Sequence, residues 1–160
     1  MYRILIVIGG NLGDTIANFD YVKSVLTTLV DIEKVSSIYR SEPCGINSKY
    51  VYDNQGFIVN SPITPTQLLE KCPEIETKMG RIRTQKYEDR IIDIDIIAVQ
   101  GMIINWSHLI IPHPHCHERN FVLTIWNELD ADWKHEILNQ KPSALLLQNH
   151  DKSIIEKLII

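Results

Sequence analysis

The chain has 160 residues, a length that fits one domain and lets about 70% of the unfolded surface be buried. Its 16 Lys and Arg residues against 20 Asp and Glu residues give a net charge of −4, which argues against nucleic acid or an anionic membrane as the partner. Any phosphate chemistry must therefore depend on local clusters of arginine.

The cysteines indicate a reducing compartment. They are odd in number and form no CxxC motif, which suits free thiols in a cytoplasm better than a disulfide framework. The apolar run near the N-terminus, residues 4–8, is too short for a signal peptide or a membrane span. We therefore expect a cytoplasmic protein with no membrane partner. The cysteines are Cys44, Cys72 and Cys116.

The first elements are a buried strand and an amphipathic helix. Residues 3–8 are predicted to form the strand, which ends at a Gly-Gly-Asn turn. Apolar residues then recur every three or four positions from Ile16 to Val30, and Asp14 is the expected N-cap of this helix. The turn matches neither a Rossmann fingerprint nor a P-loop.

Two strands and a second helix are expected next. Residues 33–40 are predicted to form a strand, residues 41–49 an irregular loop, and residues 54–61 another strand. Thr64-Pro65-Thr66-Gln67 is a helix start, with a Thr cap, Pro at the first helical position and Gln closing a capping box. Gly80 is the expected end of that helix.

The element order predicts the fold class. A strand over residues 91–99 completes the order strand, helix, strand, strand, helix, strand, which is the split βαβ arrangement of ferredoxin-like α+β folds. Further along, residues 102–111 are expected to hold a short hairpin and residues 121–126 a turn of helix or a strand. A helical stretch is predicted to begin at Pro142, and residues 148–160 are expected to form a terminal helix.

Asp93 and Asp95 lie in the middle of an isoleucine-rich strand, where a carboxylate is costly to bury without compensation. Because side chains alternate, both carboxylates project from one face about 7 Å apart, with Ile92, Ile94 and Ile96 on the other. A solvated edge strand is one interpretation. A Mg²⁺ site is the other, since Mg²⁺ takes one or two carboxylates together with substrate phosphates.

Basic residues concentrate directly before this strand, in residues 81–90. Guanidinium groups bind phosphate oxygens and carboxylates bind the metal, so the combination suits a polyphosphate with Mg²⁺. A charged loop is more often simply solvated, and its position beside the two aspartates is what favours the phosphate interpretation. The basic residues are Arg81, Arg83, Lys86 and Arg90.

Residues 110–121 contain three alternating histidines around a cysteine. In an extended chain these histidines could share a face and bind Zn²⁺, but two prolines break the regularity and the spacing is not that of structural zinc sites. A histidine beside Arg119 can instead donate hydrogen bonds to a phosphate, and Phe121 offers a flat face to a heterocycle. The histidines are His113, His115 and His117.

Five motifs together resemble the 6-hydroxymethyl-7,8-dihydropterin pyrophosphokinase family over residues 1–147. The resemblance implies a ferredoxin-like core in three α/β/α layers and an enzyme of folate biosynthesis that transfers pyrophosphate from ATP to a pterin alcohol. The motifs are IGGNLGD (8–14), YRSEPCG (39–45), GRIR (80–83), DRIIDIDI (89–96) and PHPHCHERNFVL (112–123).

For ATP, the resemblance implies that Asp93 and Asp95 bind two Mg²⁺ ions against the phosphates, with Arg81 and Arg90 near the triphosphate. These four are the expected catalytic residues. The other expected ATP-binding positions are Glu76, Arg83, Tyr87, the backbone around Ile96, His113 and Arg119.

For the pterin, the resemblance implies that Asn54 reads the edge of the ring while Tyr52 and Phe121 sandwich it. A loop is expected to supply further contacts, mainly through its backbone. The loop positions are Ser41, Pro43, Cys44 and Gly45.

The expected reaction is an in-line attack of the pterin hydroxymethyl oxygen on the β-phosphorus of ATP, releasing AMP. Such transfers need positioning and charge neutralisation more than covalent help. Two alternatives are a nucleotidyl transferase or nuclease of the same architecture, and a non-catalytic module whose HPHCH motif holds a transition metal. We expect residues 1–160 to form one domain and the protein to be a monomer that binds no nucleic acid.

Overall fold

The computed structural model describes residues 1–42, 50–82 and 89–160. Its centre is a six-stranded sheet in the order β5-β1-β4-β3-β8, with β2 also paired to β4, and all these pairs are antiparallel. A separate hairpin of β6 and β7 follows β5. The strands are β1 (Tyr2–Gly10), β2 (Asp31–Val35), β3 (Tyr39–Ser41), β4 (Tyr52–Ser61), β5 (Asp93–Val99), β6 (Ile104–Trp106), β7 (Leu109–Ile111) and β8 (Ile155–Lys157).

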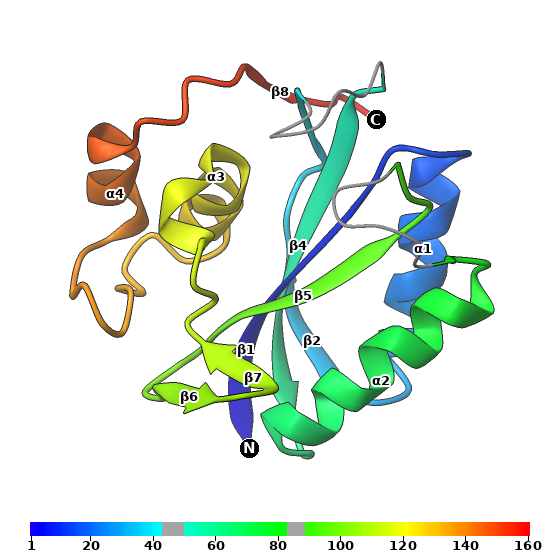
Figure 1. Cartoon of the computed structure of the whole chain (residues 1–160), viewed down its shortest axis with the longest axis horizontal. Helices are drawn as coiled ribbons and strands as arrows, with labels where there is room; N and C mark the ends of the chain where they lie inside the picture. Colours follow the sequence, from blue (N-terminus) through cyan, green and yellow to red (C-terminus); the bar gives the residue numbers. More distant parts are fainter. Residues whose placement is uncertain (43–49, 83–88) are drawn as a thin grey trace.

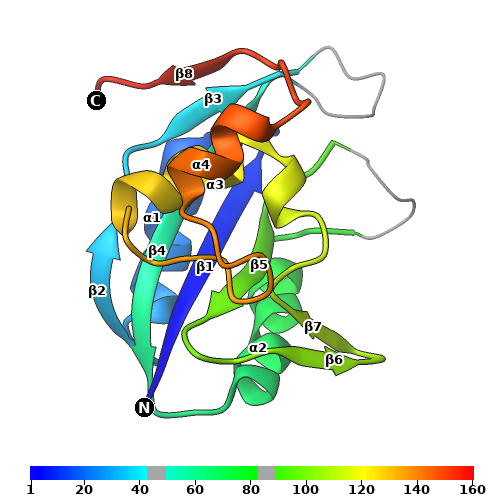
Figure 2. The same cartoon turned by 90° about the vertical axis from the view of Figure 1, so that its left-hand side faces the viewer.

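Helices lie on both faces of the sheet, as Figures 1 and 2 show. The side chains of α1 and α2 form one apolar core with the strands, and those of α3 form a second core on the opposite face. The α4 helix packs against α3. The bounds are α1 (Thr15–Leu26), α2 (Pro65–Lys78), the 3₁₀ turn η1 (Cys116–Glu118), α3 (Asn120–Leu129) and α4 (Pro142–Gln148).

The two predicted N-caps, Asp14 and Thr64, are confirmed. The carboxylate of Asp14 accepts a hydrogen bond from the N–H of Ala17 at 3.0 Å, which satisfies one of the unpaired donors of the first turn. The side chains of Thr64 and Gln67 form both bonds of a capping box, with Pro65 in the first turn. Local sequence is therefore sufficient to place the two helices that cover one face.

The α3 helix lies very close to the sheet where it crosses Gly56. A Cβ atom at this position would be 2.2 Å from Cγ2 of Ile125 and 3.0 Å from Cδ1 of Leu129. The absence of a side chain on β4 thus allows α3 to pack directly on the backbone of the strand. This contact sets the distance between α3 and the sheet, and with it the position of the segment that precedes α3.

We expect Gly56→Ala to lower the free energy of unfolding by about 1–3 kcal/mol, because the new methyl group overpacks this contact. Denaturant unfolding measures the change. In the double variant with Ile125→Ala, the atom that the methyl group meets is gone, so the combined loss should be smaller than the sum of the two single losses. Simple additivity would mean that Ile125 is not what the methyl group meets.

Of the two alternatives predicted for residues 121–126, the helix is confirmed, because they lie within α3. Two other predicted elements differ in the structure. The strand expected over residues 33–40 is divided into β2 and β3, which both pair with β4. The terminal helix expected in residues 148–160 is wrong, because Ile155–Lys157 forms β8 and pairs with β3. Within the described ranges, no helix is long and apolar enough to cross a membrane.

Candidate active site

The sheet register brings the two halves of the expected site together. Gly9 on β1 lies opposite Asp93 on β5 and also opposite Asn54 on β4. Directly paired residues point to the same face, so Asp93 and Asn54 share a face at a distance of about 10 Å, two strand spacings. Asp95 lies opposite Val7, whose side chain belongs to the α3 core. The two carboxylates therefore project on the α3 side, away from α1 and α2.

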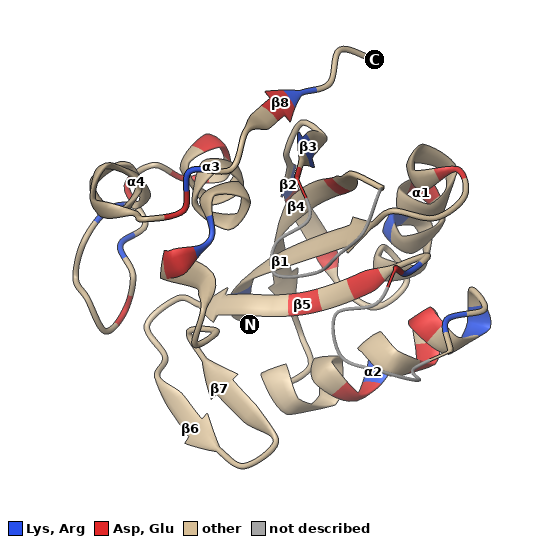
Figure 3. Cartoon of the chain, turned by 45° about the horizontal axis from the view of Figure 1, so that its top comes forward, with Lys and Arg blue, Asp and Glu red and all other residues tan. Residues whose placement is uncertain are grey.

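Two arginines bind the carboxylate of Asp93, on the acidic part of β5 visible in Figure 3. Nη1 of Arg81 lies 2.6 Å from Oδ1, and Nη1 of Arg90 lies 2.9 Å from Oδ2. Arg81 also lies 3.1 Å from Oε2 of Glu76, whose Oε1 accepts the N–H of Ile94 at 2.9 Å. Glu76 is 1% exposed. Its contacts with β5 and Arg81 therefore lie away from solvent.

Asp95 has a different environment. Burial and the neighbouring charge of Asp93 raise the pKa of the Asp95 carboxyl to about 7, while the positive charge of Arg119 opposes the shift. Burial and a neighbouring like charge thus disfavour the charged form of Asp95. A divalent cation would stabilise it.

His113 is positioned to act as a neutral donor. Its Nδ1 accepts the N–H of His115 at 3.1 Å, so the proton of the neutral ring is on Nε2. Burial lowers the pKa of His113 to about 4, and the charge of Arg119 acts in the same direction. The ring therefore stays neutral at physiological pH and can donate one hydrogen bond from Nε2.

A pocket of about 240 Å³ lies beside the carboxylates. This is slightly below the roughly 300–1,000 Å³ of whole-ligand pockets, so it can hold part of a nucleotide. The β6–β7 hairpin forms one side of the pocket. The sequence did not predict this contribution, because the residues of a hairpin do not indicate which element the hairpin packs against. The apolar lining is Leu69, Ile94, Ile96, Leu109, Ile110 and Pro114, and the polar lining is Asp95, Ser107, His108 and His113.

On the other side of β1, Asn54 is 3% exposed and its Nδ2 donates to Oγ of Ser41 at 3.1 Å. The guanidinium of Arg90 lies 5.7 Å from the ring centre of Tyr52. Phe121 packs at the edge of the α3 core. Arg90 thus contacts both halves of the site, Asp93 on one side and Tyr52 on the other.

Some predicted positions are not brought to this site or cannot be placed. His117 lies against His135, with ring centres 5.6 Å apart, so the three histidines of the HPHCH motif do not converge as a zinc site would require. Five predicted residues lie outside the described ranges, namely Pro43, Cys44, Gly45, Arg83 and Tyr87.

Asn11 holds the segment that carries Arg90. Its backbone N–H donates to the carbonyl of Arg90 at 2.9 Å, its Oδ1 accepts the N–H of Arg90 at 2.8 Å, and its Nδ2 donates to Asp89 at 2.8 Å. The approach of the two segments is close, since a Cβ on Gly10 would lie 2.3 Å from the carbonyl oxygen of Ile91. The end of β1 thereby fixes the backbone from which the Arg90 side chain extends.

We expect Asn11→Ala to lower kcat by about 100-fold, because a displacement of about 1 Å at a positioning residue has effects of this size. The thermal unfolding temperature should fall by about a few degrees, because Asn11 is buried and two of its side-chain hydrogen bonds are lost. Steady-state kinetics measure the effect, and Asn18→Ala on α1, which removes a long hydrogen bond of 3.4 Å to Leu12, is the matched control. Equal kinetics for the two variants would show that Asn11 does not position Arg90.

Arginine donors, a neutral histidine donor and two carboxylates that could hold a divalent cation meet here, and this combination is typical of an enzyme that transfers phosphate groups. The family model described as 7,8-dihydro-6-hydroxymethylpterin-pyrophosphokinase (HPPK) matches residues 5–131. The chain belongs to this family, and as a member it is a pyrophosphokinase of folate biosynthesis.

Relatives and solved structures agree with this membership. The chain is 33% identical over 134 residues to a 2-amino-4-hydroxy-6-hydroxymethyldihydropteridine pyrophosphokinase of Methylorubrum extorquens, covering 82% of this chain and 85% of that protein. It is 33% identical over 123 residues to the Bacillus subtilis protein of the same name, covering 74% and 72%. A crystal structure of wild-type Plasmodium falciparum HPPK-DHPS shares the fold, with TM-score 0.73 and 14% identity. This chain spans 44% of it, and the likeness covers 92% of this chain.

Proposed function

We propose that the chain transfers pyrophosphate from ATP to the hydroxymethyl group of 6-hydroxymethyl-7,8-dihydropterin, releasing AMP, at the site described above. The observation that carries the proposal is the register across β1, which aligns Asp93 with Asn54 through Gly9. A phosphate-binding half and a half suited to a heterocycle thereby lie about 10 Å apart. That separation suits a transfer between two bound substrates.

Asp93 and Asp95 are the residues that would hold Mg²⁺, and we infer two ions. The residues fit a hard cation because their donors are carboxylate oxygens, and because burial and the charge of Asp93 raise the pKa of Asp95, a shift that a bound cation would oppose. When bound, Mg²⁺ supplies charge neutralisation to the phosphates. Arg119, whose charge acts on Asp95, is proposed to bind a phosphate oxygen.

The arginines and His113 supply the remaining phosphate contacts. Each guanidinium has five N–H donors, so Arg81 and Arg90 can keep Asp93 and still donate to phosphate oxygens. His113 adds the Nε2 donor. The adenine base is assigned to the pocket beside Ile96, whose size suits a base better than a whole nucleotide. Arg83 and Tyr87 complete the proposed ATP site.

The pterin is assigned to the Asn54 side. The amide of Asn54 can donate to and accept from the edge of the ring, while Tyr52 and Phe121 offer aromatic faces for stacking. Ser41, Pro43, Cys44 and Gly45 are proposed to supply the remaining contacts. The attacking hydroxymethyl oxygen would then face the phosphates across β1.

We assign Glu76 an indirect role in ATP binding, since it connects the backbone of Ile94 to Arg81. The strand order and the position of α1 and α2 on one face support a ferredoxin-like core. The two cores share one sheet, which supports a single domain of residues 1–160. We further propose a cytoplasmic monomer that binds no nucleic acid.

The test is AMP formation from ATP and Mg²⁺ in the presence of 6-hydroxymethyl-7,8-dihydropterin. AMP should form only when the pterin is present, and the pterin diphosphate should appear in equal amount. ATP turnover independent of the pterin would contradict the proposed substrate. If no AMP forms, ATP binding measured with and without the pterin separates an inactive enzyme from a wrong assignment of the site.

A further inference from the structure

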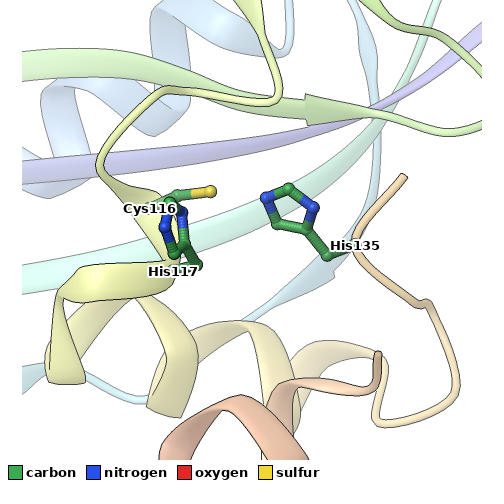
Figure 4. Close-up of side chains that lie close together, drawn as sticks. All are labelled: Cys116, His117 and His135. Carbon is green, nitrogen blue, oxygen red and sulfur yellow. The ribbon is translucent and has the colours of Figure 1, made fainter. Parts of the chain in front are cut away.

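Three side chains outside the pyrophosphokinase site form a cluster, shown in Figure 4. Cys116 and His117 belong to η1, and His135 comes from the segment after α3. One ligand atom from each side chain lies within 4.8 Å of the other two. Cys116 is 0% and His135 4% exposed, whereas the His117 side chain is 35% exposed. The cluster therefore combines a buried thiol and a buried imidazole with a second imidazole that reaches solvent.

The hydrogen bonds of His135 determine which of its nitrogens carries a proton. Nδ1 accepts the N–H groups of Ile137 and Leu138 at 3.3 and 3.1 Å. A nitrogen that accepts cannot bear the hydrogen, so the neutral ring is protonated on Nε2. Figure 4 shows this ring directed toward Cys116. His135 thus presents an N–H donor to the cluster, not a free lone pair.

His117 presents the opposite character. Its Nδ1 is one of only two buried side-chain polar atoms in the described part of the chain without a hydrogen-bond partner. Its Nε2 lies 3.7 Å from Oε1 of Glu118, so Nδ1 is the nitrogen left for the interior. A buried polar atom without a partner costs about 1–3 kcal/mol. This unpartnered nitrogen beside a thiol is what points to a ligand.

We propose that Sγ of Cys116 and Nδ1 of His117 bind a monovalent soft cation, Cu⁺, with the Nε2–H of His135 donating to the thiolate. Thiolate and imidazole ligands suit both Cu⁺ and Zn²⁺, so the number of ligands decides between the two ions. Bonds of the lengths found at zinc sites, about 2.3 Å to sulfur and 2.0 Å to nitrogen, would place two opposed ligand atoms about 4.3 Å apart, inside the 4.8 Å span of the cluster. On binding, the S–H proton leaves to solvent, an S–Cu bond forms and copper keeps its oxidation state.

Zn²⁺ fits the same residues less well. Structural zinc sites take four ligands, and His135 could become a third only by moving its proton to Nδ1 and losing both backbone hydrogen bonds. Metal-binding histidines normally donate from the other nitrogen, whereas this one accepts there. The donors present therefore fit an ion with two ligands better than an ion with four tetrahedral ligands.

The experiment uses the full chain with Cys44→Ser and Cys72→Ser, so that Cys116 is the single thiol. Anaerobic titration with Cu⁺ against a coloured Cu⁺ chelator of known affinity should give one ion per chain and a higher thermal unfolding temperature. Zn²⁺ under the same conditions should not bind at Cys116, so any Zn²⁺ that the carboxylates of Asp93 and Asp95 take up should be unaffected by Cys116→Ser. No Cu⁺ binding would overturn the proposal and leave the cluster as a hydrogen-bonded group, and Zn²⁺ binding that requires His135 would overturn the two-ligand assignment.

Variants assign the ligands. Cys116→Ser should abolish binding, and His117→Gln, which leaves the buried thiol in place, should weaken it at least about 100-fold. His135→Asn retains an oxygen to accept the two backbone N–H groups but removes the donor, so it should weaken binding about 10–100-fold. The exposed His150→Ala is the control and should change nothing. Binding that survives in both Cys116→Ser and His117→Gln places the ion elsewhere and refutes the site.

Discussion

Replacing Asp95 by Asn should abolish pyrophosphate transfer and, at pH 8, stabilise the ligand-free chain. The expected loss of kcat is at least about 1,000-fold, because the carboxylate is a proposed ligand of the ion that neutralises the phosphates. Pterin-dependent AMP formation measures the loss. A variant that keeps a tenth of the activity would exclude Asp95 as a metal ligand.

The gain in stability follows from the pKa of Asp95, which burial and the charge of Asp93 raise to about 7. An unfolded Asp has a pKa near its ordinary value of about 3.9. Between these values the folded state binds more protons than the unfolded state, so the contribution of this group to stability is lost as pH rises through about 7. The amide of the variant has no charge to bury, and the advantage of Asp95→Asn should grow from pH 4 to pH 8.

Thermal unfolding without Mg²⁺ at pH 5 and pH 8 measures this difference. Asp132→Asn is the control, because the hydrogen bond from Lys141 lowers the pKa of Asp132 and its removal should give no gain at pH 8. Asp93→Asn should not stabilise the chain either, since the ion pairs of Asp93 with Arg81 and Arg90 would be lost. An equal effect of the Asp95 variant at both pH values would contradict the electrostatic account.

The carboxylate pair could be predicted from the sequence because strand alternation is local. The three isoleucines assigned to the opposite face, Ile92, Ile94 and Ile96, do lie in the core with α1 and α2. The capping box was equally local, since its two residues are three positions apart. Where an element is defined by bonds within a few residues, periodicity and capping chemistry determine it.

The failures involve long-range contacts. A short apolar segment is compatible with a helix or a strand, and local sequence does not decide between them. Residues 155–157 form a strand because they pair with the edge of β3. The pocket depends on a hairpin packing beside β5, and the role of Asn11 depends on a segment 79 positions away. His135 was missed for the same reason, because only the fold brings it to Cys116.

Arg90→Lys separates the charge of this residue from its shape. Arg90 donates to Asp93 at 2.9 Å, lies over Tyr52, and has its backbone N–H bound by Asn11. Lysine keeps the positive charge but loses the planar fork that can bind a carboxylate and a phosphate together. We expect Arg90→Lys to lower kcat by about 100-fold and Arg90→Ala by about 1,000-fold, the lower end of the effect of arginines that stabilise phosphate transfer.

The matched control is Arg3→Lys, because Arg3 also binds two carboxylates, those of Glu33 and Asp130, but near the opposite end of β1. That variant should lose stability and keep its turnover. If Arg90→Lys retains full kcat, charge alone is sufficient and the fork has no role in the reaction. If the lysine variant is as inactive as the alanine variant, the positive charge alone contributes nothing. The transfer would then require a guanidinium that binds Asp93 and a phosphate at the same time.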